Sequence, residues 1–449
     1  MFQHYKHVHF VGIGGIGMSA LAKWFLQEGV AVSGSDVHLS PITHDLETRG
    51  AKIYSGHAGT NLAESIDLLI YSPAVPDTNL ERVSARERGI PERTNFEVLG
   101  EISKLFSTIV VSGTNGKSTT TAMLGLMLEA AGYDPTVLVG SLVPGFKDGN
   151  YRHGGGRFFV VEGCEYRANM LQLHPEMIVL TNIEEDHLDY YRDLTHIQET
   201  FQTFVDKLKG QGMVVVNADD AGSAVLNVSR PVTYGSDRSN TTYAFTQRKT
   251  AMGSQTVQTN VGELELQIPG EFNVYNALAA MSAAMELGVP FETCRRVLKD
   301  FSGIWRRFER VGVWKGADII SDYGHHPSSI KQTVEATREF FPSRRIVLCY
   351  QPHQHDRTKK LFEEFVEVLP LADHLVLTEI YDVAGRSQVH DVSSKDLVDV
   401  ISKNDPGKDV RYAQDLSAAE SHLREIVQLG DVVLIMGAGD IDEVARKLV

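Results

Sequence analysis

A short glycine-bounded loop carries the residues best suited to phosphate chemistry. It follows the apolar residues 108–111, precedes a stretch with helical periodicity, and reads Gly113-Thr114-Asn115-Gly116-Lys117-Ser118-Thr119-Thr120. Backbone amides in such a loop surround phosphates, its lysine reaches the terminal ones, and its serine hydroxyl can bind Mg²⁺. The loop is shorter than usual, because Val111 stands where the first glycine would be. We therefore expect a nucleoside triphosphate to bind here.

A second glycine motif lies near the start of the chain. It follows the apolar residues 8–11 and reads Gly12-Ile13-Gly14-Gly15-Ile16-Gly17. Glycines at this spacing let the backbone approach a diphosphate, whose charge is met by the N-terminus of the following helix. Asp36, at the end of the next expected strand, could bind a ribose hydroxyl. The motif alone indicates NAD or FAD as readily as another nucleotide, and its glycines could instead serve only close packing of helix on strand.

Candidate metal ligands follow two further expected strands. Glu162 ends the apolar run that begins at residue 158, and an acidic segment containing His187 follows residues 177–181. Because the carboxyl ends of parallel strands meet at one edge of a sheet, these oxygen and imidazole ligands could hold one Mg²⁺ near the phosphate loop. The alternative is a solvated acidic loop.

Arginines and histidines gather in the last third of the chain. Arg306 and Arg307 lie where one expected domain gives way to the next, and a guanidinium there suits a transferring phosphoryl group, although surface arginine pairs are common. A single histidine at a strand end is more often structural, but four histidines in two such segments indicate a rim that binds substrate. The two segments are Asp322-Tyr323-Gly324-His325-His326-Pro327 and Gln351-Pro352-His353-Gln354-His355-Asp356-Arg357-Thr358.

The elements that position these residues alternate between strands and helices. Apolar runs at residues 8–11, 30–33 and 68–71, with a helix at 16–28, predict a parallel sheet with helical crossovers. The alternation of strands and helices begins again at residue 108 and near residue 310. Later strands are expected at 318–321, 346–350, 374–377 and 432–436. Later helices are expected at 117–131, 273–287 and 359–368. Short polar alternation between residues 234 and 268 predicts added antiparallel strands. We expect an α/β protein of three domains: a Rossmann-like domain at residues 1–106, a central P-loop ATPase-type α/β domain at 107–310, and a Rossmann-like domain at 311–449.

Composition narrows the function classes. The 449 residues carry a net charge of −15, which argues against a nucleic-acid surface, because phosphate-backbone binding needs a concentrated positive face. No window approaches the ~20 apolar residues of a membrane span, and residues 1–10 lack the pattern of an export signal. Cys164, Cys294 and Cys349 lack metal-ligand spacing and are expected to be buried reduced thiols. We expect a soluble cytoplasmic protein, and the sequence leaves monomer and homodimer open.

Taken in order, these motifs resemble the Mur ligases over essentially the whole chain. The most specific part is the opening segment of residues 9–19 with Ser33-Gly34-Ser35-Asp36, which is similar to the branch that adds L-alanine. The resemblance implies a ligase of peptidoglycan synthesis that uses ATP with Mg²⁺ or Mn²⁺. The carboxylate of UDP-N-acetylmuramate would become an acyl phosphate, L-alanine would displace phosphate, and ADP would be released. The first domain would then bind the UDP-sugar rather than NAD, through Gly12, Gly14, Gly15, Gly17, Asp36 and Ser72.

The family's functional residues can be carried over where this chain matches them. The resemblance implies ATP binding by the phosphate loop, by two asparagines at the adenine and by an aspartate at the ribose: Gly113, Thr114, Asn115, Gly116, Lys117, Ser118, Thr119, Asn273, Asn276 and Asp322. It implies Mg²⁺ binding by Ser118, Glu162 and His187. It implies catalytic roles for Lys117, Arg307 and His325, and an amino-acid site lined by His325, His353 and Arg357.

The chain also departs from the family pattern. Phe272 replaces the usual histidine before Asn273, Ser321 replaces an aspartate before Asp322, and Glu162-Gly163-Cys164-Glu165 replaces a more acidic segment. The first departure affects one contact on the adenine side, and the third affects the surroundings of Glu162.

Three other functions stay open at this point. Within the family, the alternative is a recycling ligase that attaches a tripeptide to the same sugar nucleotide, although residues 323–326 look more like the alanine branch. An NAD-dependent oxidoreductase would account for the first glycine motif and Asp36 alone. A non-catalytic regulator would bind nucleotide without turning ATP over.

Overall fold

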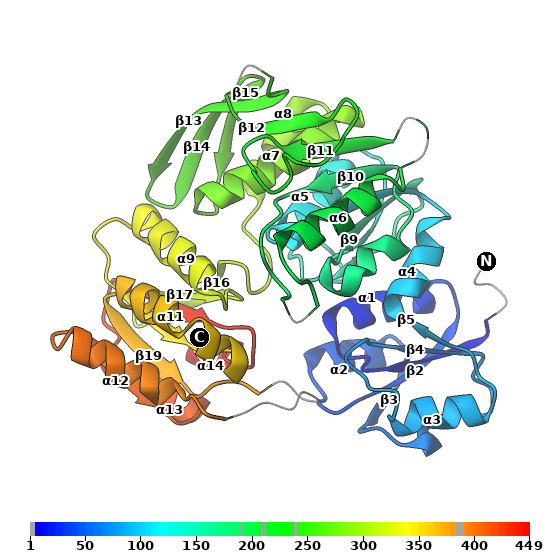
Figure 1. Cartoon of the computed structure of the whole chain (residues 1–449), viewed down its shortest axis with the longest axis horizontal. Helices are drawn as coiled ribbons and strands as arrows, with labels where there is room; N and C mark the ends of the chain where they lie inside the picture. Colours follow the sequence, from blue (N-terminus) through cyan, green and yellow to red (C-terminus); the bar gives the residue numbers. More distant parts are fainter. Residues whose placement is uncertain (1–4, 189, 209, 211, 238–239, 383–389) are drawn as a thin grey trace. The chain divides into compact units, whose positions relative to one another are not determined.

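In the computed structural model, the described residues are 5–188, 190–208, 210, 212–237, 240–382 and 390–449, and they form a mixed α/β fold with three sheets (Figure 1). The chain divides into two compact units. The first comprises residues 1–246, 258–263 and 275–298, and the second comprises residues 247–257, 264–274 and 299–449. The expected domain boundaries at residues 106/107 and 310/311 stay predictions. Among the described residues, no helix combines the length and apolar character needed to cross a membrane.

The first sheet is parallel and has the strand order β3-β2-β1-β4-β5. Its order reverses between β1 and β4, and sheets of this kind bind nucleotides at the carboxyl edge next to such a reversal. Its strands are β1 (His7–Val11), β2 (Ala31–Asp36), β3 (Lys52–Ser55), β4 (Leu68–Tyr71) and β5 (Glu92–Thr94). Its helices are α1 (Ile16–Gln27), α2 (Pro41–Thr48), η1 (Gly59–Asn61), α3 (Leu80–Glu87) and α4 (Asn95–Ser103).

The second sheet has the order β15-β14-β13-β12-β11-β10-β6-β9-β7-β8. Its centre is parallel, and the buried runs of β6, β9 and β10 explain why these strands could be read from the sequence. Its strands are β6 (Ser107–Ser112), β7 (Thr136–Leu138), β8 (Tyr151–Arg152), β9 (Phe158–Gly163), β10 (Met177–Leu180), β11 (Met213–Asn217), β12 (Val232–Ser236), β13 (Tyr243–Ala251), β14 (Ser254–Thr259) and β15 (Gly262–Leu266). The helices are α5 (Lys117–Ala130), η2 (Tyr166–Gln172), α6 (Leu194–Val205), α7 (Glu271–Glu286) and α8 (Phe291–Asp300).

The strands added to the second sheet follow the expected hairpin pattern. Two residues separate β13 from β14, and two separate β14 from β15, a connection length that joins antiparallel strands. The join to the rest of the sheet is different, because β12 and β13 pair in parallel over three residues of each strand.

The third sheet has the order β16-β17-β21-β18-β19-β20 and is parallel except for β16, which pairs antiparallel with β17. Its strands are β16 (Glu309–Trp314), β17 (Ala317–Asp322), β18 (Ile346–Tyr350), β19 (His374–Thr378), β20 (Asp409–Ala413) and β21 (Val432–Met436). Its helices are α9 (Pro327–Phe340), α10 (His355–Lys360), α11 (Phe362–Val368), η3 (Leu369–Leu371), α12 (Ser394–Asn404), α13 (Leu416–Ile426) and α14 (Asp442–Leu448). The single helix expected at residues 359–368 is wrong, because the chain leaves helical geometry at Leu361 and forms α10 and α11 instead.

One hydrophobic core connects the first two sheets. It runs from Val8 and Phe25 of the first sheet layer to Phe159 and Phe204 of the second. Close backbone approach helps to join them, since a Cβ on Gly100 of α4 would lie 2.4 Å from the carbonyl oxygen of Gln172. This shared core explains why the two sheets form one compact unit.

A buried polar cluster fixes α1 against the segment that follows β7. The Asn150 side chain donates to the carbonyl oxygen of Ile16 at 2.6 Å and to Ser19 Oγ at 2.9 Å. Its Oδ1 accepts from Lys23 Nζ at 3.0 Å, and Lys23 is only 5% exposed. Lys23 also pairs with Asp45 at 2.8 Å. The ammonium group is therefore buried with its acceptors in place.

We expect Asn150→Ala to lower the free energy of unfolding of the first unit by about 3 kcal/mol, because it removes three buried hydrogen bonds and leaves Lys23 with one acceptor fewer. Urea unfolding followed by circular dichroism measures this change. Gln27→Ala removes an exposed side-chain amide from α1, the helix that Asn150 contacts. It should change the free energy of unfolding by no more than about 0.5 kcal/mol. Equal midpoints for the two variants would contradict a structural role of Asn150.

Candidate functional site

The phosphate loop connects β6 to α5 and depends on two glycines. Gly113 has φ 137° and Gly116 has φ 82°, both in the left-handed region that favours glycine. A Cβ on either residue would also lie 2.1 Å from a neighbouring oxygen, Thr181 Oγ1 for Gly113 and Asn276 Oδ1 for Gly116. The end of β10 holds the loop, since Asn182 Oδ1 accepts from the amide of Asn115 at 2.9 Å. The amides at the N-terminus of α5 can therefore meet an anion at a fixed place.

Lys117 is the positive charge of this loop. Its Nζ donates to the carbonyl oxygens of Gly113 at 2.6 Å and Thr114 at 2.9 Å, and it pairs with Glu165 Oε2 at 2.8 Å. Burial opposes the charge of Lys117, but the Glu165 carboxylate outweighs burial and holds the pKa of Lys117 above its usual value. Glu165 is thus the acidic partner of the loop lysine.

Two groups of metal-ligating side chains lie beside the loop. Ser118 Oγ donates to Glu162 Oε2 at 3.0 Å, and the amide of Gly140 donates to the other oxygen of Glu162. His187 lies with Glu165 instead, because its Nε2 is 3.4 Å from Glu165 Oε1. Glu165, Asp186 and His187 each offer a ligand atom within 4.8 Å of the others. The structure thus brings Ser118 and Glu162 together and groups His187 with two acids that were not expected as ligands.

The asparagines expected at the adenine belong to α7. Asn276 lies against Gly116 and is within 3.4 Å of Thr120 Oγ1, so it is next to the phosphate loop. Asn273 is 5% exposed, and its side-chain Nδ2 donates to the carbonyl oxygen of Pro269 at 2.7 Å. Phe272 packs its ring against Gly270, whose Cβ would lie 2.3 Å from the ring. Asn273 therefore has a local structural role, and its role at the adenine stays a prediction.

The expected UDP-sugar residues meet at the carboxyl edge of the first sheet. Asp36 Oδ2 accepts from the amide of Gly14 at 2.9 Å, and Gly12 has φ 82° and lies against Ser72. Gly15 is the N-cap of α1, and Gly17 lies in its first turn. The glycine loop therefore closes on Asp36, beside the start of α1.

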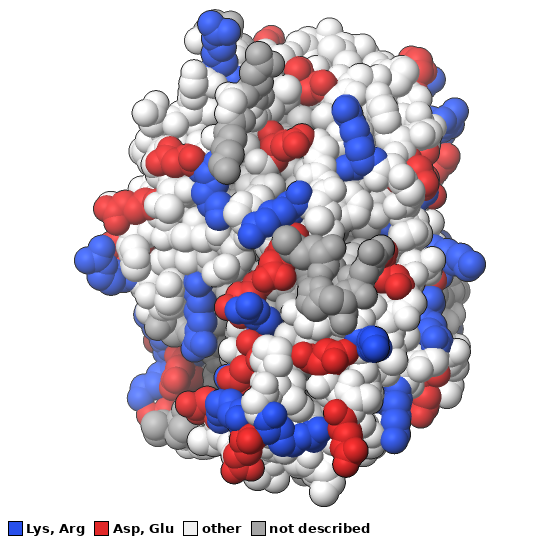
Figure 2. Space-filling model, turned by 90° about the vertical axis from the view of Figure 1, so that its right-hand side faces the viewer, with Lys and Arg blue, Asp and Glu red and all other residues white. Residues whose placement is uncertain are grey.

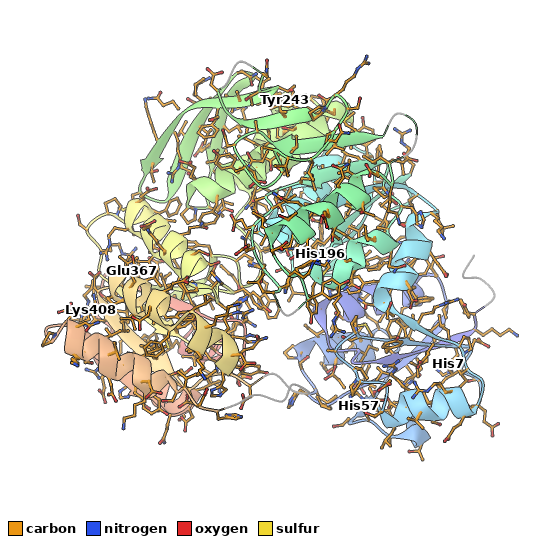
Figure 3. All side chains as sticks on the ribbon, viewed as in Figure 1. His7, His57, His196, Tyr243, Glu367 and Lys408 are labelled. Atoms are coloured by element: carbon orange, nitrogen blue, oxygen red, sulfur yellow. The ribbon has the colours of Figure 1, made fainter. Side chains whose placement is uncertain are left out.

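His57 and Glu81 reach the same edge and were not expected. His57 follows β3 and is labelled in Figure 3; its Nδ1 is 2.8 Å from Ser35 Oγ. Glu81 is fully buried and accepts from Ser35 Oγ at 2.5 Å and from Asn61 Nδ2 at 2.5 Å. Burial would raise the pKa of Glu81, but hydrogen bonds from His9, Ser35 and Asn61 outweigh it and lower that pKa. A buried carboxylate therefore lies behind His57, and the polar residues after the short strand β3 were the only sequence signal for it.

In the second unit, Asp322 holds the turn that follows β17. Its carboxylate accepts from the amides of Gly324 at 2.7 Å and Phe308 at 2.8 Å. Burial raises the pKa of Asp322, and Arg307 opposes this shift. The Arg307 guanidinium lies 4.9 Å from the centroid of the Tyr323 ring. Arg306 instead donates to the carbonyl oxygens of Gly437 and Gly439 at 2.5 and 2.8 Å, so its role is structural.

The expected substrate residues form a second cluster in this unit. The rings of His325 and His353 are 5.7 Å apart, and His353 stacks on Tyr381 with an interplanar angle of 8°. Arg357 Nη1 lies 3.4 Å from His353 Nδ1. Burial, followed by the nearby Arg357 charge, lowers the pKa of His325 to about 3. His325 is therefore an uncharged imidazole at neutral pH, beside one guanidinium.

The charged residues outside these clusters show no segregation by sign on the face drawn in Figure 2, where Lys and Arg are interspersed with Asp and Glu. This face therefore offers no concentrated positive surface of the kind that binding to a nucleic-acid backbone needs.

Three family models match the chain in order. The model described as Mur ligase family, catalytic domain, matches residues 7–107; the Mur ligase middle domain matches 111–284; and the Mur ligase, glutamate ligase domain, matches 306–439. The chain belongs to the Mur ligase family. The three matched ranges include the first glycine motif, the phosphate loop and both histidine segments.

Individual Mur ligases are similar over the full length. A UDP-N-acetylmuramate–L-alanine ligase of Caldanaerobacter subterraneus subsp. tengcongensis is 39% identical, with 99% of this chain and 97% of that relative covered. One of Geotalea uraniireducens is 40% identical, with coverages of 100% and 98%. The crystal structure of the UDP-N-acetylmuramate-alanine ligase MurC from Thermotoga maritima is similar with a TM-score of 0.85 and 30% identity, covering 98% of each chain. A murein peptide ligase from Psychrobacter arcticus shares the fold at 23% identity, with a TM-score of 0.74 and coverages of 99% and 98%.

We expect His325 to stay uncharged in the folded protein from pH 8 to pH 5. In the unfolded chain, His325 binds a proton near pH 6.5. In the folded protein, the same side chain binds a proton only near pH 3, because its pKa is lowered to about 3. Stability therefore decreases as pH falls from about 6.5 toward 3, by at most about 1.4 kcal/mol per pH unit from this group. His325→Gln should reduce that slope in urea unfolding. Imidazole ¹⁵N shifts, assigned with the variant, test the charge directly, and a shift change centred near pH 6.5 would exclude the neutral state.

Proposed function

We propose that this Mur ligase joins L-alanine to the carboxylate of UDP-N-acetylmuramate, at the expense of ATP, in the synthesis of peptidoglycan precursors. The observation that carries the proposal is the full-length similarity to UDP-N-acetylmuramate–L-alanine ligases at 39 and 40% identity. The reaction transfers the terminal phosphoryl group of ATP to the carboxylate, giving ADP and an acyl phosphate. The amine then attacks the acyl carbon and gives up a proton, and the C–O bond to phosphate breaks. The products are an amide and inorganic phosphate.

The phosphate loop is the ATP site in this proposal. The amides that begin α5 and the ammonium of Lys117 would bind the terminal phosphates, and Lys117 would stabilise the charge that develops during transfer. Glu162 and Ser118 offer the hard oxygen ligands that Mg²⁺ prefers, and His187 lies in the neighbouring group. When bound, Mg²⁺ or Mn²⁺ supplies electrophilic stabilisation of the phosphates.

The first sheet is the UDP-sugar site in this proposal. Its support is the carboxyl edge of that sheet, where Gly12, Gly14, Asp36 and Ser72 converge. The amides at the start of α1 would meet the diphosphate. Family membership argues against the oxidoreductase alternative, because the first glycine motif and the phosphate loop both lie in ranges that Mur ligase models match.

The cluster of His325, His353 and Arg357 is the proposed amino-acid site. The Arg357 guanidinium can pair with the carboxylate of an amino acid. An uncharged His325 does not repel the amino group and can accept a hydrogen bond from it. The cluster therefore offers one cation and one neutral acceptor for a zwitterion.

Lys117→Ala tests the ATP assignment. We expect kcat to fall by about 1,000-fold, because a preorganised cation at the transferring phosphoryl group is lost. Affinity for UDP-N-acetylmuramate, measured by calorimetric titration, should change by less than about 2-fold, since the UDP site lies on a different sheet. Phosphate release measures turnover, and Lys147→Ala removes an exposed lysine as a control.

Loss of UDP-sugar affinity in Lys117→Ala equal to its loss of activity would refute the separation of the two sites. Absence of phosphate release by the wild type with all substrates present would favour the non-catalytic regulator instead.

The choice of amine separates the two ligase branches. We expect L-alanine to be preferred over glycine by about 10- to 200-fold in kcat/KM, because a pocket gains only about 1 to 3 kcal/mol from one methyl group. A murein tripeptide should fail for lack of space. A competition assay with all three amines, analysed by mass spectrometry, measures the products. Predominant transfer of the tripeptide would assign the chain to the recycling branch.

A further inference from the structure

A second group of metal-ligating side chains lies in the second unit, outside the residues assigned above. His355 begins α10, Asp382 follows β19 and His390 precedes α12. Each offers a ligand atom within 4.8 Å of the others. His355 Nε2 is 3.4 Å from Asp382 Oδ1, and His390 Nε2 is 3.9 Å from Asp382 Oδ2. Three separate segments of the chain therefore converge on one point.

The orientation of His355 is fixed by its other nitrogen. Nδ1 lies 2.8 Å from the carbonyl oxygen of Val392, which can only accept, so Nδ1 carries a hydrogen. In the neutral ring, Nε2 is then a lone pair that faces the carboxylate of Asp382, and two acceptors facing each other require a proton or a cation between them. The side chain is only 7% exposed. A backbone carbonyl behind a histidine is also the usual arrangement behind metal-binding imidazoles.

The spacing of the three side chains fits a metal ion. Imidazole nitrogen and carboxylate oxygen bind Zn²⁺ at about 2.0 to 2.2 Å, and two such ligands at a tetrahedral angle are about 3.4 Å apart. His355 Nε2 lies at this distance from Asp382 Oδ1, 3.4 Å, and His390 Nε2 lies 3.9 Å from the other oxygen, Oδ2. Two imidazoles and one carboxylate favour Zn²⁺, Co²⁺ or Ni²⁺ over Mg²⁺, which prefers oxygen. Lys359, one turn along α10, pairs with Asp391, so its charge is balanced.

We propose that His355, Asp382 and His390 form a binding site for a zinc-type divalent ion, separate from the Mg²⁺ site of the phosphate loop. The site joins the start of α10 to the segments that follow β19 and precede α12.

The proposed ion would act on residues of the amino-acid cluster. Two of the three segments already contact each other. The backbone amide of Tyr381 donates to the carbonyl oxygen of Pro352 at 2.8 Å, and its carbonyl oxygen accepts from the amide of Gln354 at 3.2 Å. His353 forms a bridge with Tyr381 and stacks on its ring. Arg357 lies two residues after His355 in α10. Resting on the proposed function, the ion is expected to lower KM for L-alanine by holding His353 and Arg357 in place, with kcat unchanged.

Zinc titration of the metal-stripped protein, by calorimetry with Mg²⁺ in excess, tests the site. We expect one Zn²⁺ equivalent to be lost in His390→Ala and in Asp382→Asn. That equivalent should remain in His44→Ala, which removes an exposed histidine of the first unit, and in His187→Ala, which removes the ligand group beside the phosphate loop. Visible absorption of bound Co²⁺ should show imidazole coordination that His390→Ala abolishes.

Zinc stoichiometry and the cobalt spectrum unchanged in both His390→Ala and Asp382→Asn would overturn the proposal, as would zinc binding by the wild type that depends on His187 alone. Zinc binding that depends on His390, in a protein that fails to ligate L-alanine, would refute the proposed function and leave the metal site in place.

Discussion

The charge of Lys117 is the constraint on which the proposed nucleotide site depends. The chain has a net charge of −15, so an anionic nucleotide cannot be held by a general positive field and must be met by a local cation and backbone amides. The local cation is buried, and a buried ammonium is tolerated only with acceptors in place. Glu165 and two loop carbonyls provide them. The tight glycines of the loop follow from the same need, because they let the backbone fold around the lysine.

Parallel sheets supply the geometry that brings such groups together. Gly12, Asp36 and Ser72 come from different strands of the first sheet and meet because all its strands end at one edge. The same rule puts Glu162 next to the loop after β6, since β9 pairs directly with β6. The second unit repeats the pattern with Asp322 at the end of β17 and His353 after β18. Function in this fold thus depends on strand order more than on distance along the chain.

The sequence predicted what local patterns encode. Buried strands such as β4, β18 and β21 were expected at the bounds the structure has, because continuous apolar runs mark fully buried parallel strands. The short strands β3 and β5 lack such runs and were missed, and with β3 the position of His57 was missed too. Glu165 could not be identified as the partner of Lys117, because that pairing depends on how the segment after β9 turns back toward the loop. The break at Leu361 could not be predicted either, because no glycine or proline lies in residues 355–368.

The departure at residues 162–165 also has a physical explanation. Burial, followed by the neighbouring Glu165, raises the pKa of Cys164 to about 12, so this residue is a neutral thiol at physiological pH and not a thiolate ligand. At its place in this less acidic segment, Cys164 therefore adds no negative charge to the surroundings of Lys117. The two carboxylates of this segment contact different groups. Glu162 accepts hydrogen bonds from Ser118 and Gly140. Glu165 pairs with Lys117 and lies 3.4 Å from His187. A third carboxylate would have no further cation to balance it among these contacts, and its free-energy cost would fall on Lys117, the lysine proposed to bind ATP.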